Sequence, residues 1–222
     1  MTYLELINKV LVGLREDTVL GISDHYSKLI GQFVNEAKEE IEDMGPWYAL
    51  RTTLTGSTVA GTETVDLTAS SNERSYIIEN PTDNGGGVWI VTSGSEDRLE
   101  RKSWEDLENL YNRDVDQDQQ EPEYYAVRVT SDGLELRLWP CPDAVYSLKV
   151  RACVPQAELT DKTTVLTIAA APVWKLALAK AMDERGSEFA GQAAVSNDKA
   201  MKAIMDYYLR DWGQEAHTVT AV

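Results

Sequence analysis

The spacing of apolar residues changes twice along this chain, and that change constrains the fold more than any single motif does. Apolar residues recur at helical intervals up to residue 48, at every second position over much of 49–169, and at helical intervals again from 170 onward. The first spacing is that of one face of a helix, and the second is that of one face of a strand. The sequence therefore predicts helices at both ends and a mostly β segment between them.

Two helices are expected before residue 48. The first follows Thr2, because Thr2 with Glu5 three residues later has the pattern of a capping box. The second follows Ser23 or Asp24, either of which can cap it, and it ends at Gly45-Pro46. Its apolar stripe is Tyr26, Leu29, Ile30, Phe33, Ala37, Ile41 and Met44. The polar residues expected on its other faces are Lys28, Asn35, Glu36, Lys38, Glu39, Glu40, Glu42 and Asp43.

The middle of the chain is rich in β-favouring residues. Short strands are expected at 50–55, 62–68, 75–80 and 87–92. Ser103 is expected to cap a short helix that ends near Asn112. Apolar and polar residues alternate most clearly over 134–138 and 146–154, which we interpret as an antiparallel pair joined by 139–145. Tyr125, Val127 and Val129 are expected in a strand alongside this pair.

The helical spacing returns in the last third of the chain. Residues from Pro172 to Met182 are apolar on nearly all sides, which predicts a helix buried on more than one side. A last helix is expected from about Glu188 to Trp212, with an apolar stripe of Met201, Ile204, Met205, Tyr208, Leu209 and Trp212. Residues 214–222 follow as a tail that either frays or adds to a partner's surface as an extended strand.

Neither terminal pair of helices can bury its apolar stripe alone. We therefore expect an α+β fold in which residues 1–48 and 170–213 pack together as a discontinuous four-helix bundle. Residues 49–169 form an inserted, mostly antiparallel β-domain with one short helix, and residues 214–222 form a C-terminal tail.

The sequence offers little for catalysis. Its two histidines, His25 and His217, lie near segment ends in polar surroundings, and no nucleophile elbow is present. The run Asn84–Gly87 is not followed by the Lys and Ser or Thr of a phosphate-binding loop, so a hairpin turn is expected there. We therefore expect no enzymatic activity and no cofactor.

The run Asp114–Asp118 resembles the start of a calcium-binding loop. Gln119 stands where that loop needs glycine, and Tyr125 stands where it needs a bidentate glutamate. Glu121 and Glu123 could supply oxygens in an irregular site, so a solvated acidic loop and a calcium site both stay open. We assign no metal ligand. A binding module for calcium or a glycan, using this loop and exposed aromatic residues, is the alternative to a structural role.

The net charge of -16 disfavours sequence-specific binding of nucleic acid, because an acidic surface repels phosphates. No apolar run approaches the roughly 20 residues needed to cross a bilayer, and Met1–Glu5 lacks the basic start of a signal peptide. We expect no membrane association and synthesis in the cytosol.

The cysteines and tryptophans fit this picture. Cys141 and Cys153 are not level across the expected strand pair, which predicts two free thiols. Core positions are expected for Trp174 and Trp212, and candidate interface anchors are Trp47, Trp89 and Trp104.

Several segments, in this order and spacing, resemble one known family. They are Tyr3–Leu11, Tyr26–Ala37, Leu50–Thr55, the proline-rich turn Leu136–Asp143, and Pro172–Ala181 followed by Glu184-Arg185-Gly186. In these segments the chain is similar to the head-to-tail adaptor proteins of short-tailed bacteriophages, the tail tubular protein A type. The resemblance spans most of the chain.

The resemblance implies a structural virion protein that forms a dodecameric ring beneath the portal protein. Its helical part would contact the portal, its β part would meet the tail nozzle protein, and DNA would pass through the bore without specific binding during ejection. The protein would be assembled in the host cytoplasm and would reside in the tail connector of the virion. In the family the C-terminal segment docks into the portal, so the candidate portal-binding residues here are Trp212, His217, Val219 and Val222.

Overall fold

The protein has an α+β fold made of two compact units. The computed structural model describes residues 1–67, 74–78, 87–92, 95–113, 119–130, 133–187 and 189–218, with the backbone alone described for 212–218. One unit combines Met1–Leu50 with Gln156–Val222 and is called the helical unit below. The other, Arg51–Pro155, is called the β-unit.

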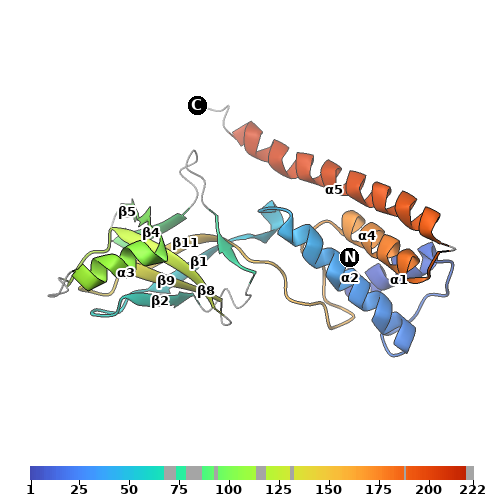
Figure 1. Ribbon diagram of the computed structural model, residues 1–222, viewed down its shortest axis with the longest axis horizontal. Coiled ribbons are helices and arrows are strands. Elements are labelled where there is room, and N and C mark those ends of the chain that lie inside the picture. Colours follow the sequence, from blue (N-terminus) through green and yellow to red (C-terminus); the bar gives the residue numbers. More distant parts are fainter. Residues whose placement is uncertain are drawn as a thin grey trace. The chain divides into compact units, whose positions relative to one another are not determined.

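In the part of the helical unit that the structure describes, there are four α-helices and a short 3-10 helix. The helices are α1 (Tyr3–Gly13), α2 (His25–Asp43), α4 (Ala170–Glu184) and α5 (Ala190–Thr218), and the 3-10 helix is Tyr48–Leu50. Helix α4 contacts α1, α2 and α5, and α1 also contacts α2. Helix α5 packs mainly along α4 (Figure 1). The three helices α1, α2 and α4 therefore pack against one another, and α5 is added to them on the side of α4.

The starts of α1 and α2 confirm the expected caps. The backbone N–H of Glu5 donates to the Thr2 hydroxyl at 3.3 Å, and the N–H of Thr2 donates to the Glu5 carboxylate at 2.9 Å. Asp24 caps α2 by accepting from the N–H of Ser27 at 2.8 Å. These contacts join neighbouring residues and satisfy N–H groups that a helix start leaves open, so local sequence suffices to predict them.

The buried face of α2 differs from the expected one. Ile30, Val34, Ala37 and Ile41 are buried, but so are the polar side chains of Asn35, Lys38 and Glu42. The prediction that these three polar residues lie on other faces of α2, away from its buried face, is therefore wrong. Met44, expected in the apolar stripe, is 44% exposed. The polar side chains are buried because a distant segment of the chain supplies partners for them, as described below.

Helices α4 and α5 form the C-terminal part of the unit. Helix α4 is buried on several sides, as its composition predicted, through Pro172, Val173, Leu176, Ala177, Ala179, Ala181 and Met182. Helix α5 continues to Thr218, beyond the expected end at Trp212. Its predicted stripe divides into two parts. Ile204 is buried, together with Ala193 and Ala200, whereas Met201, Met205 and Leu209 are exposed.

The described residues of the β-unit form two larger sheets and a pair of short strands. One sheet has the order β1-β11-β4-β5, with β3 also paired to β11. Its strands are β1 (Arg51–Ser57), β3 (Tyr76–Ile77), β4 (Gly87–Thr92), β5 (Ser95–Arg98) and β11 (Ser147–Cys153). The other sheet has the order β2-β9-β8-β6, from β2 (Thr64–Leu67), β6 (Glu100–Arg101), β8 (Tyr124–Thr130) and β9 (Gly133–Trp139). The short pair is β7 (Gln119–Gln120) with β10 (Cys141–Pro142).

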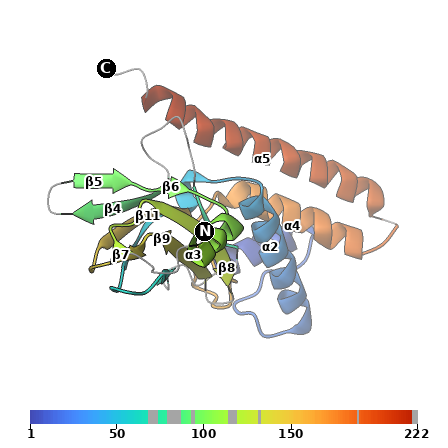
Figure 2. The same ribbon diagram turned by 60° about the vertical axis from the view of Figure 1, so that its left-hand side comes forward.

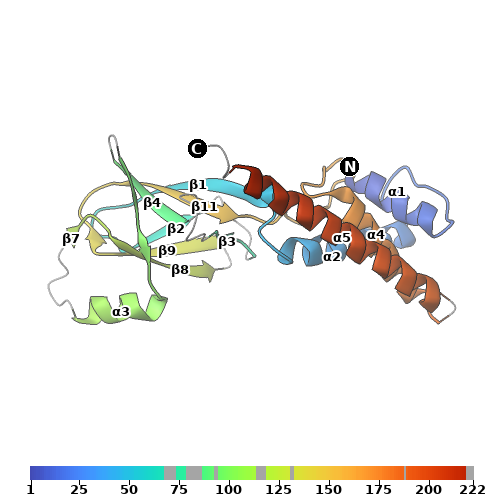
Figure 3. The same ribbon diagram turned by 90° about the horizontal axis from the view of Figure 1, so that it is seen from above.

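Helix α3 (Trp104–Arg113) completes the β-unit and contacts β8 and β9 (Figure 2). The hydroxyl of Ser103 accepts from the N–H of Asp106 at 3.0 Å, which confirms Ser103 as the predicted cap. Figure 3 shows α3 beside β8, apart from β1 and β11 of the other sheet. The strand β9 is therefore covered on one face by α3 and on the other by the core of the unit.

The expected antiparallel pair of 134–138 with 146–154 is wrong. Strand β9 pairs with β8 and β2, so that Leu136 lies opposite Val127 and Val65. Strand β11 instead pairs with β1 and β4, so that Val150 lies opposite Leu54 and Val88. The connector between them passes from one sheet to the other. Side chains from both sheets form one core. Alternation of apolar and polar residues predicts which face of a strand is buried, but it does not predict which strand lies beside it.

The candidate metal-binding and glycine-rich segments, the membrane prediction and the cysteines can be compared with the structure only in part. The acidic run 114–118, and all of the glycine-rich run except Gly87, lie outside the described residues. Within the described ranges, no group of three or more His, Cys, Asp or Glu side chains could hold a metal ion. Among the helices described, none combines the length and the apolarity needed to cross a bilayer. Cys141 and Cys153 are both buried, and no disulfide joins them.

Candidate functional site

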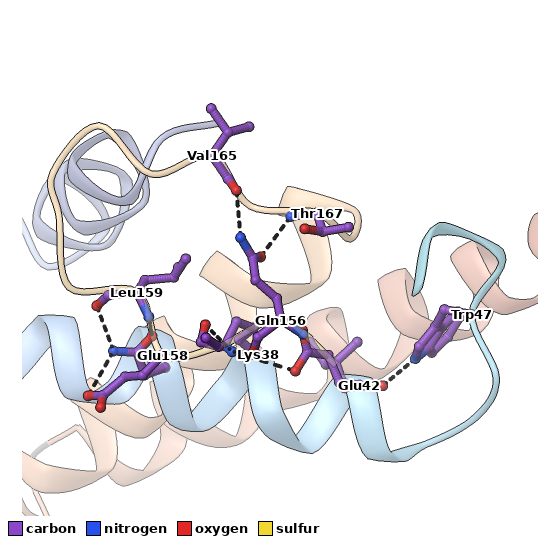
Figure 4. A network of polar contacts seen from close by, with 11 residues as sticks. Lys38, Glu42, Trp47, Gln156, Glu158, Leu159, Val165 and Thr167 are labelled. Carbon is purple, nitrogen blue, oxygen red and sulfur yellow. Dashed lines mark hydrogen bonds and ion pairs between the residues drawn. The ribbon is translucent and has the colours of Figure 1, made fainter. Parts of the chain in front are cut away.

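A cluster of buried polar side chains on α2 holds the segment 156–168, which we call the strap. Lys38 Nζ donates to the backbone oxygens of Gln156 at 2.5 Å and Ala157 at 3.0 Å. The Glu42 carboxylate lies 3.5 Å from the same Nζ and accepts from the N–H of Gln156. Figure 4 shows the strap lying along α2 beside Lys38 and Glu42. Both of these side chains are fully buried, so the strap takes the place of water as their partner.

Asn35 extends the same cluster by one turn of α2. Its Nδ2 donates to the backbone oxygen of Leu159 at 3.1 Å, and its Oδ1 accepts from the N–H of Leu159 at 3.0 Å. Asn35 Nδ2 also lies 3.5 Å from the Tyr3 hydroxyl. Burial, and next the charge of Glu158, raise the pKa of Tyr3. The paired contacts of Asn35 copy those of a strand and fix the register of the strap on α2.

The strap also contacts the start of α1 and folds back on itself. The N–H of Tyr3 donates to the backbone oxygen of Thr164 at 2.9 Å, and the N–H of Leu166 donates to that of Met1 at 3.0 Å. The Gln156 side chain bridges the strap, donating to Val165 O at 2.8 Å and accepting from the N–H of Thr167 at 2.9 Å. The strap is therefore bound to both N-terminal helices before it enters α4.

A group of aromatic rings ties the end of α2 to α5. The Trp47 indole is 1% exposed, and its N–H donates to the backbone oxygen of Ile41. Its ring stacks on Tyr207 with centroids 4.8 Å apart and meets Tyr208 edge-on at 5.6 Å. The N–H of Tyr48 donates to the Asp211 carboxylate at 2.8 Å. Trp47, a candidate interface anchor in the sequence, is thus a core residue, which corrects that expectation.

Trp174, expected in the core, is half-buried on α4. The ammonium groups of Lys9 and Lys175 lie 5.9 and 5.8 Å from the centroid of its ring. One part of the indole is therefore packed, and two flexible cationic side chains lie near its ring.

A groove of about 390 Å³ lies along α4 between α2 and α5. Small residues line it from α4 and α5, among them Ala179, Ala190 and Ala194. Lys180 and Glu40 line it with charge and form an ion pair at 2.6 Å, and Lys180 also lies 3.6 Å from Glu36. The groove exists because α5 packs mainly on α4 and leaves the space toward α2 open.

An exposed apolar stripe continues along α5 from this groove. Met201, Met205 and Leu209 are 45%, 61% and 67% exposed and follow one another at four-residue intervals. Residues at this spacing lie on one face of a helix. Large apolar side chains in a row on a helix surface are typical of an interaction surface.

In the β-unit, two arginines of the β8–β9 sheet meet aromatic rings of α3. The guanidinium groups of Arg128 and Arg137 lie 4.6 and 5.5 Å from the Trp104 ring centroid. Arg128 pairs with Glu135 and Arg137 pairs with Glu63. These contacts, together with the buried side chain of Leu107, hold α3 on the sheet.

Tyr111 provides the polar anchor of α3, and its replacement by Phe tests that role. Its buried hydroxyl donates to the backbone oxygen of Leu138, and burial is the main cause of its raised pKa. We expect Tyr111→Phe to lower the free energy of unfolding of the β-unit by about 1–3 kcal/mol, because the carbonyl is left without its donor in the interior. Urea unfolding followed by tryptophan fluorescence measures this loss. A change below about 0.5 kcal/mol would contradict the anchoring role.

The sequence-predicted portal-binding residues lie at the far end of α5. The backbones of Trp212 and His217 belong to α5, whereas their side chains fall outside the described part of the chain. Val219 and Val222 lie outside it entirely. Their assignment therefore stays a prediction.

The polar cluster and the groove were not predicted from the sequence. A signal for the cluster was present, because Asn35, Lys38 and Glu42 are spaced so that they share one face of α2. The groove has no such signal, since it depends on how far α5 stands from α2.

Residues 1–221 match the model of the SU10 adaptor protein family. The match covers all but the last residue of the chain. The chain belongs to the SU10 adaptor protein family. This is a family of phage head-to-tail adaptors, which confirms the resemblance found in the sequence. No curated protein matches the chain.

Membership of the SU10 adaptor family assigns the protein a structural role in a phage virion. The family is structural, which suggests that the protein is not an enzyme. An adaptor associates with other virion components, such as portal and tail proteins. The strap, the Trp47 rings and the exposed face of α5 are therefore best understood as parts of an assembly protein.

Proposed function

We propose that the protein forms a ring between the portal and the tail nozzle of a phage virion, and that DNA passes through its bore. The observation that carries this proposal is the exposed stripe of α5. Met201, Met205 and Leu209 point away from the helical unit's core on the helix that leads to the C-terminal residues. Together with membership of an adaptor family, this stripe supports a protein that completes its packing on partners.

Within this proposal each unit has one task. The helical unit, with its four helices acting as one bundle, contacts the portal, and the β-unit meets the nozzle. The C-terminal residues Trp212, His217, Val219 and Val222 dock into the portal. The ring is dodecameric, as the family resemblance implies, and successive subunits meet through two different surfaces, as in any cyclic ring.

The charge of the chain supports the passage of DNA without capture. With a net charge of -16, a ring of these subunits has a strongly negative surface. Lys and Arg contacts to phosphates supply most of the affinity of non-specific DNA binding, so an acidic bore allows DNA to slide during ejection.

The test is to mix the purified protein with the portal of its phage and to examine the product by electron microscopy and native mass measurement. We expect a ring of fixed copy number on one face of the portal. Removing residues 212–222 should weaken portal binding by about 100-fold or more, as expected when the anchors of an interface are lost. Val129→Glu, at an exposed site on β8, should have no effect and serves as the control. A full-length protein that stays monomeric and does not bind the portal would refute the proposal.

A further inference from the structure

The groove between α2 and α5 has two unlike walls. The α5 wall is largely apolar, since Ala194 lines the groove together with other alanines and one polar residue, Asn197. It continues through Met201 and Met205, seven and eleven residues beyond Ala194 on the same flank. Small alanines let another backbone approach closely, and methionine side chains adapt to different partners. This wall therefore fits an apolar stripe on an incoming helix.

The opposite wall and part of the floor are acidic. Glu36 and Glu40 of α2 both lie within 4 Å of Lys180, at 3.6 and 2.6 Å, and Asp183 lines the groove from α4. Two carboxylates thus pair with one ammonium group and a third carboxylate lines the same groove, which leaves an excess of negative charge. A partner that brings lysine or arginine to this side gains favourable contacts, and one that brings acidic residues is repelled.

We propose that the groove binds an amphipathic helix of another virion component, with its apolar stripe on α5 and a lysine- or arginine-rich flank on Glu36 and Glu40. The proposal rests on the proposed function, which requires the chain to contact other virion proteins. Binding of an amphipathic helix in a groove is a common mode of recognition. The groove then contacts apolar side chains that recur at helical spacing on the bound helix. The groove supplies the apolar side, and the carboxylates select the charge and the orientation of the helix.

A second copy of this chain fits the groove less well. The chain has a net charge of -16, so another copy would add negative charge beside an acidic wall. Among the described helices, the exposed apolar stripe belongs to α5 itself, and its neighbours Asp198 and Lys202 carry opposite charges. No described helix of this chain thus offers an apolar stripe with a basic flank.

The test uses the full chain and two fluorescent, designed helical peptides of roughly 18 residues, or five turns. Both carry the same leucine stripe, one with a lysine flank and the other with a glutamate flank, and binding is measured by fluorescence anisotropy. We expect the lysine peptide to bind at least about tenfold more tightly, because the flank meets carboxylates. Glu40→Lys should reduce or reverse that preference, and Met205→Glu should weaken binding by about tenfold or more.

Val195→Glu is the matched control, because Val195 is 52% exposed on α5, next to Ala194 but one hundred degrees around the helix from it. It should leave binding unchanged. Equal binding of both peptides, no binding, or the same loss in Val195→Glu and Met205→Glu would overturn the assignment. So would sedimentation that shows a dimer of this chain lost in Met205→Glu.

The outcomes separate this inference from the proposed function. A chain that binds the portal but neither peptide overturns the groove assignment and leaves the adaptor role intact. A chain that binds the lysine peptide selectively but does not form a ring on the portal supports the groove assignment and overturns the proposed ring. Circular dichroism of each variant shows that the helical unit is folded before binding is compared.

Discussion

The Lys38→Met variant is expected to lose about 3–5 kcal/mol of unfolding free energy in the helical unit. Lys38 is completely buried, and its ammonium group contacts the Glu42 carboxylate and the backbone oxygens of Gln156 and Ala157. Methionine keeps most of the volume but removes the positive charge. Glu42 is 1% exposed, so its carboxylate would stay buried without this cation. Removing one member of a buried ion pair is costly for that reason.

Urea unfolding followed by far-ultraviolet circular dichroism measures this loss, because most helical residues belong to this unit. The control is Lys180→Met in the same unit, which breaks surface pairs with Glu40 and Glu36, whose side chains are 51% and 55% exposed. That change should cost less than about 1 kcal/mol. The double variant Lys38→Met/Glu42→Leu should regain much of the loss, since no buried charge remains. A Lys38→Met variant as stable as the control would show that the strap is not held by this pair.

Features that depend on neighbouring residues were predictable from the sequence. The caps at Thr2, Asp24 and Ser103 each rest on a contact three residues along the chain, and all three are present. The strand expected at 87–92 has those bounds as β4. Local hydrogen bonding and side-chain spacing fix such features whatever the rest of the chain does.

Features that depend on distant partners were not predictable. The spacing of apolar residues along α2 predicts that Lys38 lies in solvent, because this spacing contains no information about Gln156, which lies 118 residues further along the chain. In the same way, alternation predicted that 134–138 and 146–154 each bury one face, but Leu136 and Val150 proved to belong to different sheets of one core. The alternating pattern predicts which face of each strand is buried, whereas the order of strands in the sheets determines which strand pairs with it.

The same distinction between local and distant contacts explains which parts of the candidate site were predictable. The apolar stripe of α5 was visible in the sequence, yet only the structure shows that Ile204 packs inward while Met205 and Leu209 are exposed. Trp47 follows Gly45-Pro46 at a segment edge, which favoured an interface position in the sequence. Its burial depends on Tyr207 and Tyr208 at the other end of the chain.

Trp47→Ala is expected to destabilise the helical unit by about 3–5 kcal/mol and to loosen the C-terminal half of α5. The indole is buried, stacks on Tyr207, meets Tyr208 edge-on and donates to Ile41 O, so alanine leaves a cavity and removes three contacts. Because these rings join α5 to the end of α2, hydrogen exchange should accelerate in the α5 amides near Tyr207 more than in α1. Urea unfolding and exchange followed by mass spectrometry measure the two effects.

Two further variants separate the roles of the Trp47 ring. Trp47→Phe keeps an aromatic ring but loses the N–H donor, and should cost about 0.5–1.5 kcal/mol, because the Ile41 carbonyl still accepts from the N–H of Met44 at 3.3 Å. Trp174→Ala removes a half-buried indole from α4 and should cost less than Trp47→Ala, because less apolar surface leaves the interior. Exchange in α5 that is unchanged by Trp47→Ala would mean that α4 alone holds α5. If the rings do hold it, the same variant should weaken binding to the portal, since the helix that carries the C-terminal residues would no longer be held in place before docking.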